Sequence, residues 1–149
     1  MAYTYLLYHI VIRPKASKPV IAEEYEKELY AYIWGICKEK KCYLHRINGM
    51  PDHLHILVEI HPSIAIADFV RELKVSTNSW IRNNHDKFPY FETWGKSYCA
   101  LTYSHSEKET VKKYIMEQKE HHKVTSFKDE YNALLKEFGI TPDQWMLTD

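Results

Sequence analysis

The sequence has few cysteines, no long apolar run and no signal-peptide pattern in its first residues. Its three cysteines (Cys37, Cys42 and Cys99) contain no Cys-x-x-Cys pair, and an odd number cannot all form disulfides within one chain. Reduced thiols and a cytoplasmic location are therefore expected. No stretch approaches the roughly 20 apolar residues that span a bilayer. The N-terminus also lacks the basic start and cleavage site of a signal peptide. We therefore expect no membrane partner.

An excess of charge of one sign is also missing, because 20 basic and 20 acidic residues cancel. This balance counts against indiscriminate binding to long duplex DNA, which depends on many phosphate contacts. It does not exclude a local basic groove, since the local field depends on where the charges lie. Apolar residues make up 45% of the 149 residues, too many for a disordered chain. The four glycines and six prolines are scattered, so we expect one domain over residues 1–149.

The hydrophobic patterns predict alternating strands and helices. Strands are expected over residues 3–13, 42–47, 53–60 and 94–103, and a turn-rich connection over 48–52. Helices are expected over residues 21–41, 64–84, 106–123 and 127–138, with Ser63 and Ser126 as N-caps, a capping box over 106–109 and a stop at Gly139.

The predicted order, β-α-β-β-α-β followed by two C-terminal helices, is the ferredoxin-like arrangement. The expected class is therefore α+β, with an antiparallel four-stranded sheet and two helices packed on one face. The other face needs a cover, which the C-terminal helices, a ligand or a second subunit would provide.

The densest chemical pattern is His53-Leu54-His55 in the third predicted strand. Side chains alternate along a strand, so His53 and His55 share one face and Leu54 points to the other. Two imidazoles on a rigid strand can hold one metal ion from adjacent corners. The alternative interpretation, two structural histidines on a sheet, is equally compatible with His-x-His alone.

A second pattern lies on the predicted helix over residues 106–123. Tyr114 and Gln118 are spaced i, i+4 and share one helix face, where they can present a phenol and an amide together. On its own this spacing favours an amphipathic helix with a packed tyrosine and a solvated glutamine. His122 extends the same face and His121 lies beside it. We interpret these two histidines as phosphate contacts or polar surface rather than as metal ligands.

The combination of these patterns resembles one family. The His-x-His strand, the Tyr-x-x-x-Gln helix and the ferredoxin-like order are similar to the single-tyrosine transposases of the HUH superfamily. These are the insertion-sequence 200-like enzymes of bacterial and archaeal elements that move as single-stranded DNA. The resemblance covers nearly the whole chain and is most specific over residues 51–55, 66–74, 94–98 and 114–123.

The resemblance implies a role for each of four residues. His53 and His55 match the two metal-binding histidines, Gln118 matches the third metal ligand, and Tyr114 matches the nucleophile. Family members recognise DNA hairpins near the ends of the element. They form homodimers whose sheets join edge to edge, and the tyrosine helix of one subunit often completes the active site of the other.

The implied reaction is transesterification at a DNA phosphate through a 5′-phosphotyrosine, which conserves the bond energy for rejoining. A neutral ligand set of two imidazoles and one amide, with open positions for phosphate and water, suits Mg²⁺ or Mn²⁺. Asp52 is a candidate to orient the imidazole of His53, although a turn-forming aspartate is an equal alternative. The DNA-binding candidates are basic residues of the second and third predicted helices: Arg71, Lys74, Arg82, Lys112, Lys113, Lys119 and Lys123.

Three alternatives stay open from the sequence. A zinc-dependent hydrolase would use His53, His55 and His121 or His122 with water as the nucleophile, and would keep its activity when Tyr114 becomes phenylalanine. A domesticated hairpin-binding protein would keep the fold without cleavage. A replication initiator or plasmid nickase would share the chemistry, but such proteins are usually larger.

Overall fold

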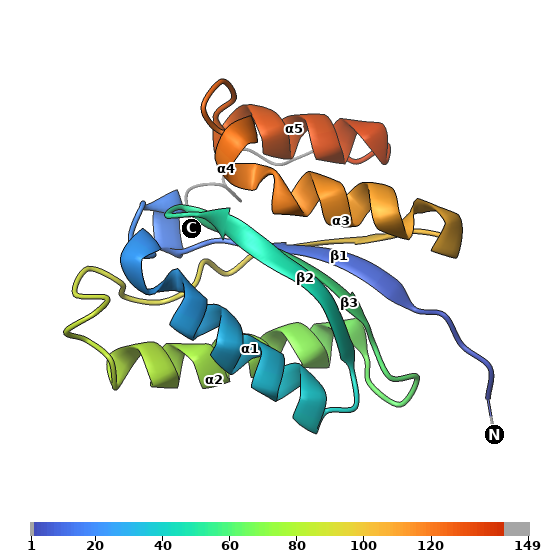
Figure 1. Ribbon diagram of the computed structural model, residues 1–149, viewed down its shortest axis with the longest axis horizontal. Helices are drawn as coiled ribbons and strands as arrows, with labels where there is room; N and C mark the ends of the chain where they lie inside the picture. The colour runs from blue at the N-terminus through green and yellow to red at the C-terminus, as the bar shows by residue number, and fades with distance from the viewer. Residues whose placement is uncertain (1, 142–149) are drawn as a thin grey trace.

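The computed structural model describes residues 2–141 and is built around one antiparallel sheet (Figure 1). The strand order is β2-β3-β1-β4, which confirms the predicted ferredoxin-like sheet. The strands are β1 (Leu7–Ile12), β2 (Tyr43–Met50), β3 (His53–Glu59) and β4 (Cys99–Thr102). The helices are α1 (Glu26–Glu39), α2 (Ile66–Arg82), α3 (Lys108–Met116), α4 (Gln118–His121) and α5 (Phe127–Glu137), with short 3₁₀ turns at Lys15–Ser17, Glu23–Tyr25 and His105–Glu107. No helix of the described residues is long and apolar enough to cross a membrane.

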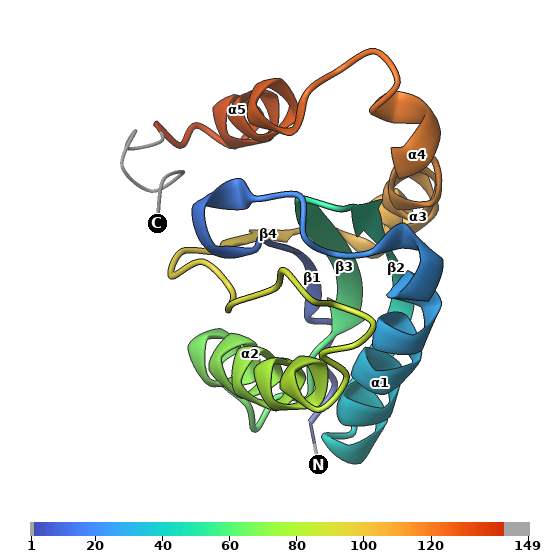
Figure 2. The same cartoon turned by 90° about the vertical axis from the view of Figure 1, so that its left-hand side faces the viewer.

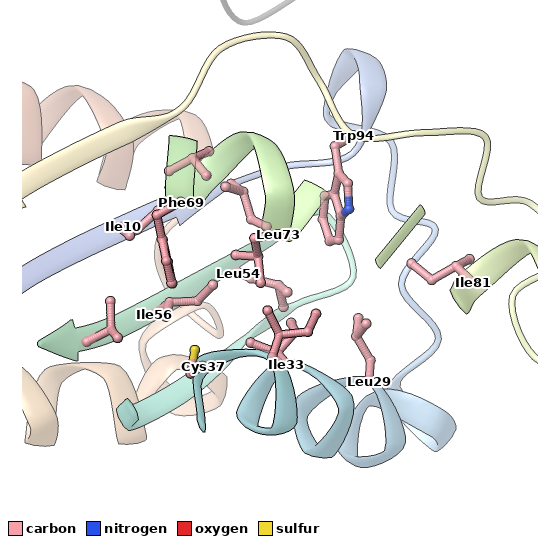
Figure 3. Packing of buried hydrophobic residues seen from close by; sticks show 14 of the residues in the cluster. Ile10, Leu29, Ile33, Cys37, Leu54, Ile56, Phe69, Leu73, Ile81 and Trp94 are labelled. Carbon is pink, nitrogen blue, oxygen red and sulfur yellow. The ribbon is translucent and has the colours of Figure 1, made fainter. Parts of the chain in front are cut away.

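The main core lies between the sheet and the pair α1 and α2. Alternate residues of the central strands, such as Ile10 on β1 and Leu54 and Ile56 on β3, point to this side and are fully buried. They meet Leu29 and Ile33 of α1, and residues of α2 complete the layer (Figure 3). The period of two in the strands and the helical spacing in α1 and α2 therefore bury a common layer.

The C-terminal helices cover the other face of the sheet, one of the three covers that the sequence allowed (Figure 2). Two small apolar clusters attach them. Helix α3 packs through Val111 and Ile115 on Leu7 and Leu57. Helix α5 packs on Val11 of β1 and on β4 through the apolar stripe Phe127, Tyr131, Leu134 and Leu135.

A tight hairpin joins β2 to β3 and places His53 at the start of its strand. The connection was predicted over residues 48–52, but β2 continues to Met50 and only two residues turn the chain. Gly49 explains this close pairing, because a Cβ at that position would lie 2.2 Å from the carbonyl oxygen of His53. Only glycine lets the two backbones approach so closely.

The fourth strand is shorter than the predicted 94–103, because its ladder stops at Cys99. Trp94 makes only an isolated bridge to Pro14, which has no N–H to continue a ladder. The first strand likewise begins at Leu7 rather than Tyr3, since its partner β3 ends opposite Leu7, at Glu59.

The helix predicted over residues 106–123 is broken at Glu117, which has φ −90° and ψ 14°. Asn48 compensates for the break, because its Nδ2 donates to the carbonyl oxygens of Ile115 (3.0 Å) and Met116 (3.1 Å). The predicted capping box was also misplaced. Ser104 and Glu107 form it, two residues earlier than expected.

Two other predicted helix starts were early, and one cap was right. Helix α1 is preceded by a 3₁₀ turn and begins at Glu26, not at residue 21. Ser63 does not cap α2, because its Oγ bonds Nδ1 of His61 (2.7 Å), and the helix begins at Ile66. Ser126 caps α5 as predicted, by accepting from the backbone N–H of Asp129.

Candidate active site

His53 and His55 lie on the sheet face that α3, α4 and α5 cover. Both side chains are 0% exposed, opposite the apolar face of Leu54 and Ile56, as the alternation predicted. Nδ1 of His53 lies 2.7 Å from Oδ1 of Asp52, so the predicted contact between these neighbours is present. Its Nε2 is thereby directed away from the hairpin and toward the helices.

Gln118 begins α4 and points into this cluster. Its Oε1 lies 3.1 Å from Nε2 of His53, and its side chain is 0% exposed. Although the helix breaks between Tyr114 and Gln118, both side chains reach one carboxylate, that of Glu130. The phenol of Tyr114 donates a short hydrogen bond to Oε2 of Glu130, and Nε2 of Gln118 donates to the same oxygen over 2.8 Å.

Glu130 is the residue at the centre of the site, and the sequence analysis missed it. The residue is only 3% exposed. Oε1 lies 3.0 Å from Nε2 of His55 and 3.2 Å from Nε2 of His53. A local signal was available, because Glu130 interrupts the apolar stripe of α5 between Phe127 and Tyr131, a position where an unpaired charge is unfavourable.

His121, the last residue of α4, and His122, the C-cap of that helix, also face Glu130. Nε2 of His122 lies 3.0 Å from Oε1, and Nδ1 of His122 bonds the carbonyl of Thr125 over 2.7 Å. The side chain of His122 is only 5% exposed, so its interpretation as polar surface was wrong. His121 is more open, and its Nε2 lies 3.5 Å from Oε2 of Glu130.

His9 of β1 is a further member that the sequence analysis missed. Its Nε2 lies 2.7 Å from Nδ1 of His55, and the side chain is 0% exposed. The ferredoxin-like order contained the signal, since it pairs the first strand with the third. Val11 pairs with His55, and His9, two residues away, lies on the same face.

The pKa values of three buried histidines, His9, His53 and His55, are shifted in different directions. Burial lowers the pKa of His55 to about 4, and it lowers the pKa of His9 well below its usual value, with further lowering from His55. Burial also acts on His53, but hydrogen bonds to Asp52 and Glu130 outweigh it and raise the pKa. Of His9, His53 and His55, His53 is thus the imidazole that most readily carries a proton, because an acceptor lies beside each of its nitrogens.

The pKa values of the two acidic groups of the site, Tyr114 and Glu130, are shifted in opposite directions. Burial raises the pKa of Tyr114 well above its usual value, and the hydrogen bond to Glu130 raises it further. Burial alone would raise the pKa of Glu130, but hydrogen bonds from His53 and His55 hold it far below the usual range. At neutral pH the site therefore holds a carboxylate beside a neutral phenol.

The donor set fits a divalent cation. In the described part of the chain, ligand atoms of His53, His55 and Glu130 all lie within 4.8 Å of one another, and a second such group joins Glu130 to His121 and His122. Imidazole nitrogen together with carboxylate or amide oxygen is a set that Mn²⁺, Mg²⁺ and Zn²⁺ all accept. The ring of Tyr114 lies beside the first group, 5.7 Å from the ring of His55.

The basic candidates of α2 lie in the layer on the opposite side of the sheet from this cluster (Figure 2). Nζ of Lys74 donates to the carbonyl of Gly95 over 2.8 Å and approaches those of the next two residues, so it fixes the loop before β4. Arg71 is exposed beside Asp68, at 2.8 Å, and Arg82 is exposed at the end of the helix.

The basic candidates around α3 and α4 lie in the same layer as the cluster. Nζ of Lys119 is bound by Glu26 (3.0 Å) and by the β2–β3 hairpin, so it has a structural role. Lys113 and Lys123 are exposed, whereas Lys112 is half-buried and lies 3.8 Å from Glu109.

Comparison with known sequences gives a consistent family assignment. The profile of the family described as "Transposase IS200 like" matches residues 2–118. The chain is 30% identical over 124 residues to the ISDra2 transposase TnpA of Deinococcus radiodurans, covering 78% of this chain and 86% of that protein. It is 26% identical over 121 residues to the transposase for insertion sequence element IS200 of Salmonella typhimurium, covering 78% and 79%.

Solved structures agree with the sequence matches. A crystal structure of a protein from Deinococcus radiodurans, assigned as a transposase, aligns with a TM-score of 0.62 at 28% identity, over 79% of this chain and 95% of that one. A REP-associated tyrosine transposase bound to a REP hairpin has the same fold, with a TM-score of 0.60 at 11% identity, over 82% and 73%.

Together, the fold and the sequence matches place the chain among the DNA transposases. More specifically, the chain belongs to the IS200-like transposase family, whose profile covers most of its length. Glu130 lies beyond the part that this profile matches.

Proposed function

We propose that this transposase cleaves and rejoins single-stranded DNA at the ends of its insertion sequence, with Tyr114 as the nucleophile and His53, His55 and Gln118 as ligands of Mg²⁺ or Mn²⁺. One observation carries the proposal. Tyr114 and Gln118 reach the same carboxylate that His53 and His55 contact, so the phenol and the three ligands converge within a single chain.

In the proposed reaction, Oη of Tyr114 attacks the phosphorus of the scissile phosphodiester. The Tyr–O–P bond forms as the P–O3′ bond breaks, which leaves a 5′-phosphotyrosine and a DNA end that takes up a proton to become a 3′-hydroxyl. Attack of another 3′-hydroxyl on the phosphotyrosine reverses these bonds and rejoins a strand without ATP. When bound, the divalent cation supplies positive charge to the phosphate oxygens and the leaving oxygen.

The residues of the chain prepare this step. Asp52 and His9 hold the imidazoles of His53 and His55 from behind, so that both Nε2 atoms face the same point. Because the pKa of Tyr114 is raised, the phenol is neutral at neutral pH and must lose its proton as the bond to phosphorus forms. Glu130 accepts the hydrogen bond from that phenol.

We propose a DNA hairpin in a single strand as the binding partner. Support comes from a transposase of the same fold that is described as bound to a hairpin. Lys112, Lys113 and Lys123 are the candidate phosphate contacts on the layer that carries Tyr114, whereas Arg71 and Arg82 would extend contacts to the other side. The edge-to-edge homodimer, with or without a shared active site, and the cytoplasmic location both stay predictions.

The test is to incubate the protein with single-stranded oligonucleotides that carry the hairpins of its flanking DNA, in Mg²⁺ or Mn²⁺. We expect a DNA–protein adduct that survives denaturation, and mass spectrometry should assign the attached peptide to residue 114. Cut strands without any adduct would favour the zinc-dependent hydrolase. If the folded protein neither cuts nor captures any strand, the proposal is wrong.

A further inference from the structure

Glu130 is a buried carboxylate whose charge needs compensation. It is 3% exposed, in a helix whose other inward residues are apolar. A buried anion is costly unless it is paired or binds a metal ion. Within residues 2–141 its ion-pair partners are all imidazoles, those of His53, His55, His121 and His122.

Those imidazoles compensate the charge only in part. An imidazole is positively charged only when both of its nitrogens carry protons, and Nδ1 of His55 already lies 2.7 Å from Nε2 of the buried His9. A neutral imidazole that donates from Nε2 to Glu130 must leave its Nδ1 as an acceptor, and for His55 that atom faces Nε2 of His9. A divalent cation between these groups would supply the missing positive charge directly.

The distances between the donor atoms around Glu130 match the separation of adjacent ligands in a metal coordination shell. Adjacent ligands of an octahedral ion with bonds of about 2.1 Å lie about 3.0 Å apart. Oε1 of Glu130 lies 3.0 Å from Nε2 of His55 and 3.2 Å from Nε2 of His53. Oε1 of Gln118 lies 3.1 Å from the same nitrogen of His53. The three separations that connect the four donor atoms are thus those expected between adjacent ligands of one ion.

We infer that Glu130 is a fourth protein ligand of the divalent cation, which binds through Oε1. This inference rests on the proposed function, since it takes His53, His55 and Gln118 as the other ligands. Oε2 stays bonded to the phenol of Tyr114 and to Nε2 of Gln118. One carboxylate therefore links the cation to the nucleophile and fixes the distance between them.

A fourth ligand changes the character of the site. Two imidazoles and an amide leave the double charge of the cation intact, whereas a carboxylate reduces the net charge of the site to about +1. Mg²⁺ and Mn²⁺ favour oxygen ligands, and six-fold coordination leaves two positions for phosphate oxygens or water. The cation would also attach α5 to the sheet.

The test measures Mn²⁺ affinity of the full chain by isothermal titration calorimetry, without DNA. We expect wild type to bind one Mn²⁺ and Glu130→Gln to bind it at least tenfold more weakly, because the substitution removes the ligand charge at nearly constant shape. Glu137→Gln is the matched control, since Glu137 is exposed on the same helix, and it should bind like wild type.

Each result separates the inference from the proposed function. If Glu130→Gln binds Mn²⁺ as tightly as wild type, or more tightly, Glu130 is no ligand. Tighter binding would show that the carboxylate competes with the cation for the imidazoles. In either case the three-ligand site survives, provided that His53→Ala abolishes binding. If His53→Ala leaves binding intact, or wild type binds no Mn²⁺, both the inference and the proposed metal site are wrong.

A measurement on the unmodified protein covers the case in which Glu130→Gln does not fold. One equivalent of Mg²⁺ should shift a carboxylate stretching band in the infrared difference spectrum of wild type, and Glu137→Gln should show the same shift. Absence of any carboxylate shift at one equivalent would overturn the inference.

Discussion

Nε2 of His9 lies 2.7 Å from Nδ1 of His55, and both side chains are 0% exposed. Only one of the two nitrogens can carry the shared proton. When Nε2 of His55 binds a cation, the proton of His55 must lie on Nδ1, and His9 is then its acceptor. His9 is thus placed to select the tautomer of His55 that the proposed metal site requires.

Replacement of His9 should therefore weaken metal binding without removing a ligand. We expect His9→Phe to lower Mn²⁺ affinity by about tenfold or more, the usual effect of losing a partner behind a ligand. His9→Gln retains an acceptor oxygen and should lose less. Calorimetry on both variants checks the order, and equal losses would indicate a packing effect instead.

Replacement of Tyr114 should separate chemistry from binding. Tyr114→Phe should abolish the covalent DNA adduct while leaving Mn²⁺ stoichiometry and hairpin affinity near wild type. It should also lower the free energy of unfolding by about 1 kcal/mol, because Glu130 loses one hydrogen bond. Gel analysis of denatured reactions provides the readout, and a persistent adduct would exclude Tyr114 as the nucleophile.

The pKa shifts predict that stability in EDTA passes through a maximum with pH. The lowered pKa of His55, about 4, means that the unfolded chain binds more protons between about pH 4 and 6.5. Stability should rise with pH over that window, by at most about 1.4 kcal/mol per pH unit for this group. The raised pKa of His53 acts in the opposite sense, so its contribution is lost as pH rises through the folded-state pKa.

Urea denaturation at several pH values tests this pair of slopes. His55→Gln should flatten the acid side, whereas His53→Gln should flatten the decline above about pH 6.5. Unchanged slopes in both variants would show that neither histidine controls the pH dependence.

The β2–β3 hairpin should tolerate no side chain at Gly49. A Cβ there would lie 2.2 Å from the carbonyl oxygen of His53 and 2.9 Å from Cα of Leu54. We expect Gly49→Ala to cost about 2 kcal/mol and to weaken Mn²⁺ binding, because His53 must move with the hairpin. Gly35→Ala in α1 is the matched control. Nothing lies within 4 Å of its Cβ, and alanine should stabilise the helix by about 0.5–1 kcal/mol.

Binding of single-stranded DNA should depend on the lysines of the Tyr114 layer. Lys113→Gln and Lys123→Gln should each weaken binding and reduce the slope of log K against log salt by about 0.7. Arg82→Gln, exposed on the opposite layer, should have a smaller effect. Fluorescence anisotropy over a salt series measures the slopes, and an equal effect of Arg82 would extend the interface to α2.

The sequence was most informative where the chain is periodic. The alternation of β3 predicted the shared face of His53 and His55, and the order of elements predicted the sheet topology. Boundaries that depend on tertiary partners were wrong. The break at Glu117 is compensated by Asn48, which lies far away in the sequence on strand β2, and no local pattern reports such a partner.

Glu130 and His9 were missed for a related reason. Each is a single polar residue within an apolar element, and its role depends on which element packs against it. The stripe of α5 identifies Glu130 as a buried charge but cannot show that its carboxylate reaches the two histidines of β3. Strand pairing identifies a neighbour for His9, yet its contact with His55 depends on the register of β1 and β3.

The apolar stripe of α5 has a consequence for how copies of this gene decay. A stop codon after Gln118 would preserve every residue that the family profile matches. It would nevertheless remove Glu130 and expose Val11, Cys99 and Leu101, which α5 covers. Such a truncated copy would still be recognised as a relative in a genome, but its product would carry an uncovered hydrophobic surface prone to aggregation. Sequence similarity over the matched region is therefore insufficient to identify a copy that encodes a folded protein.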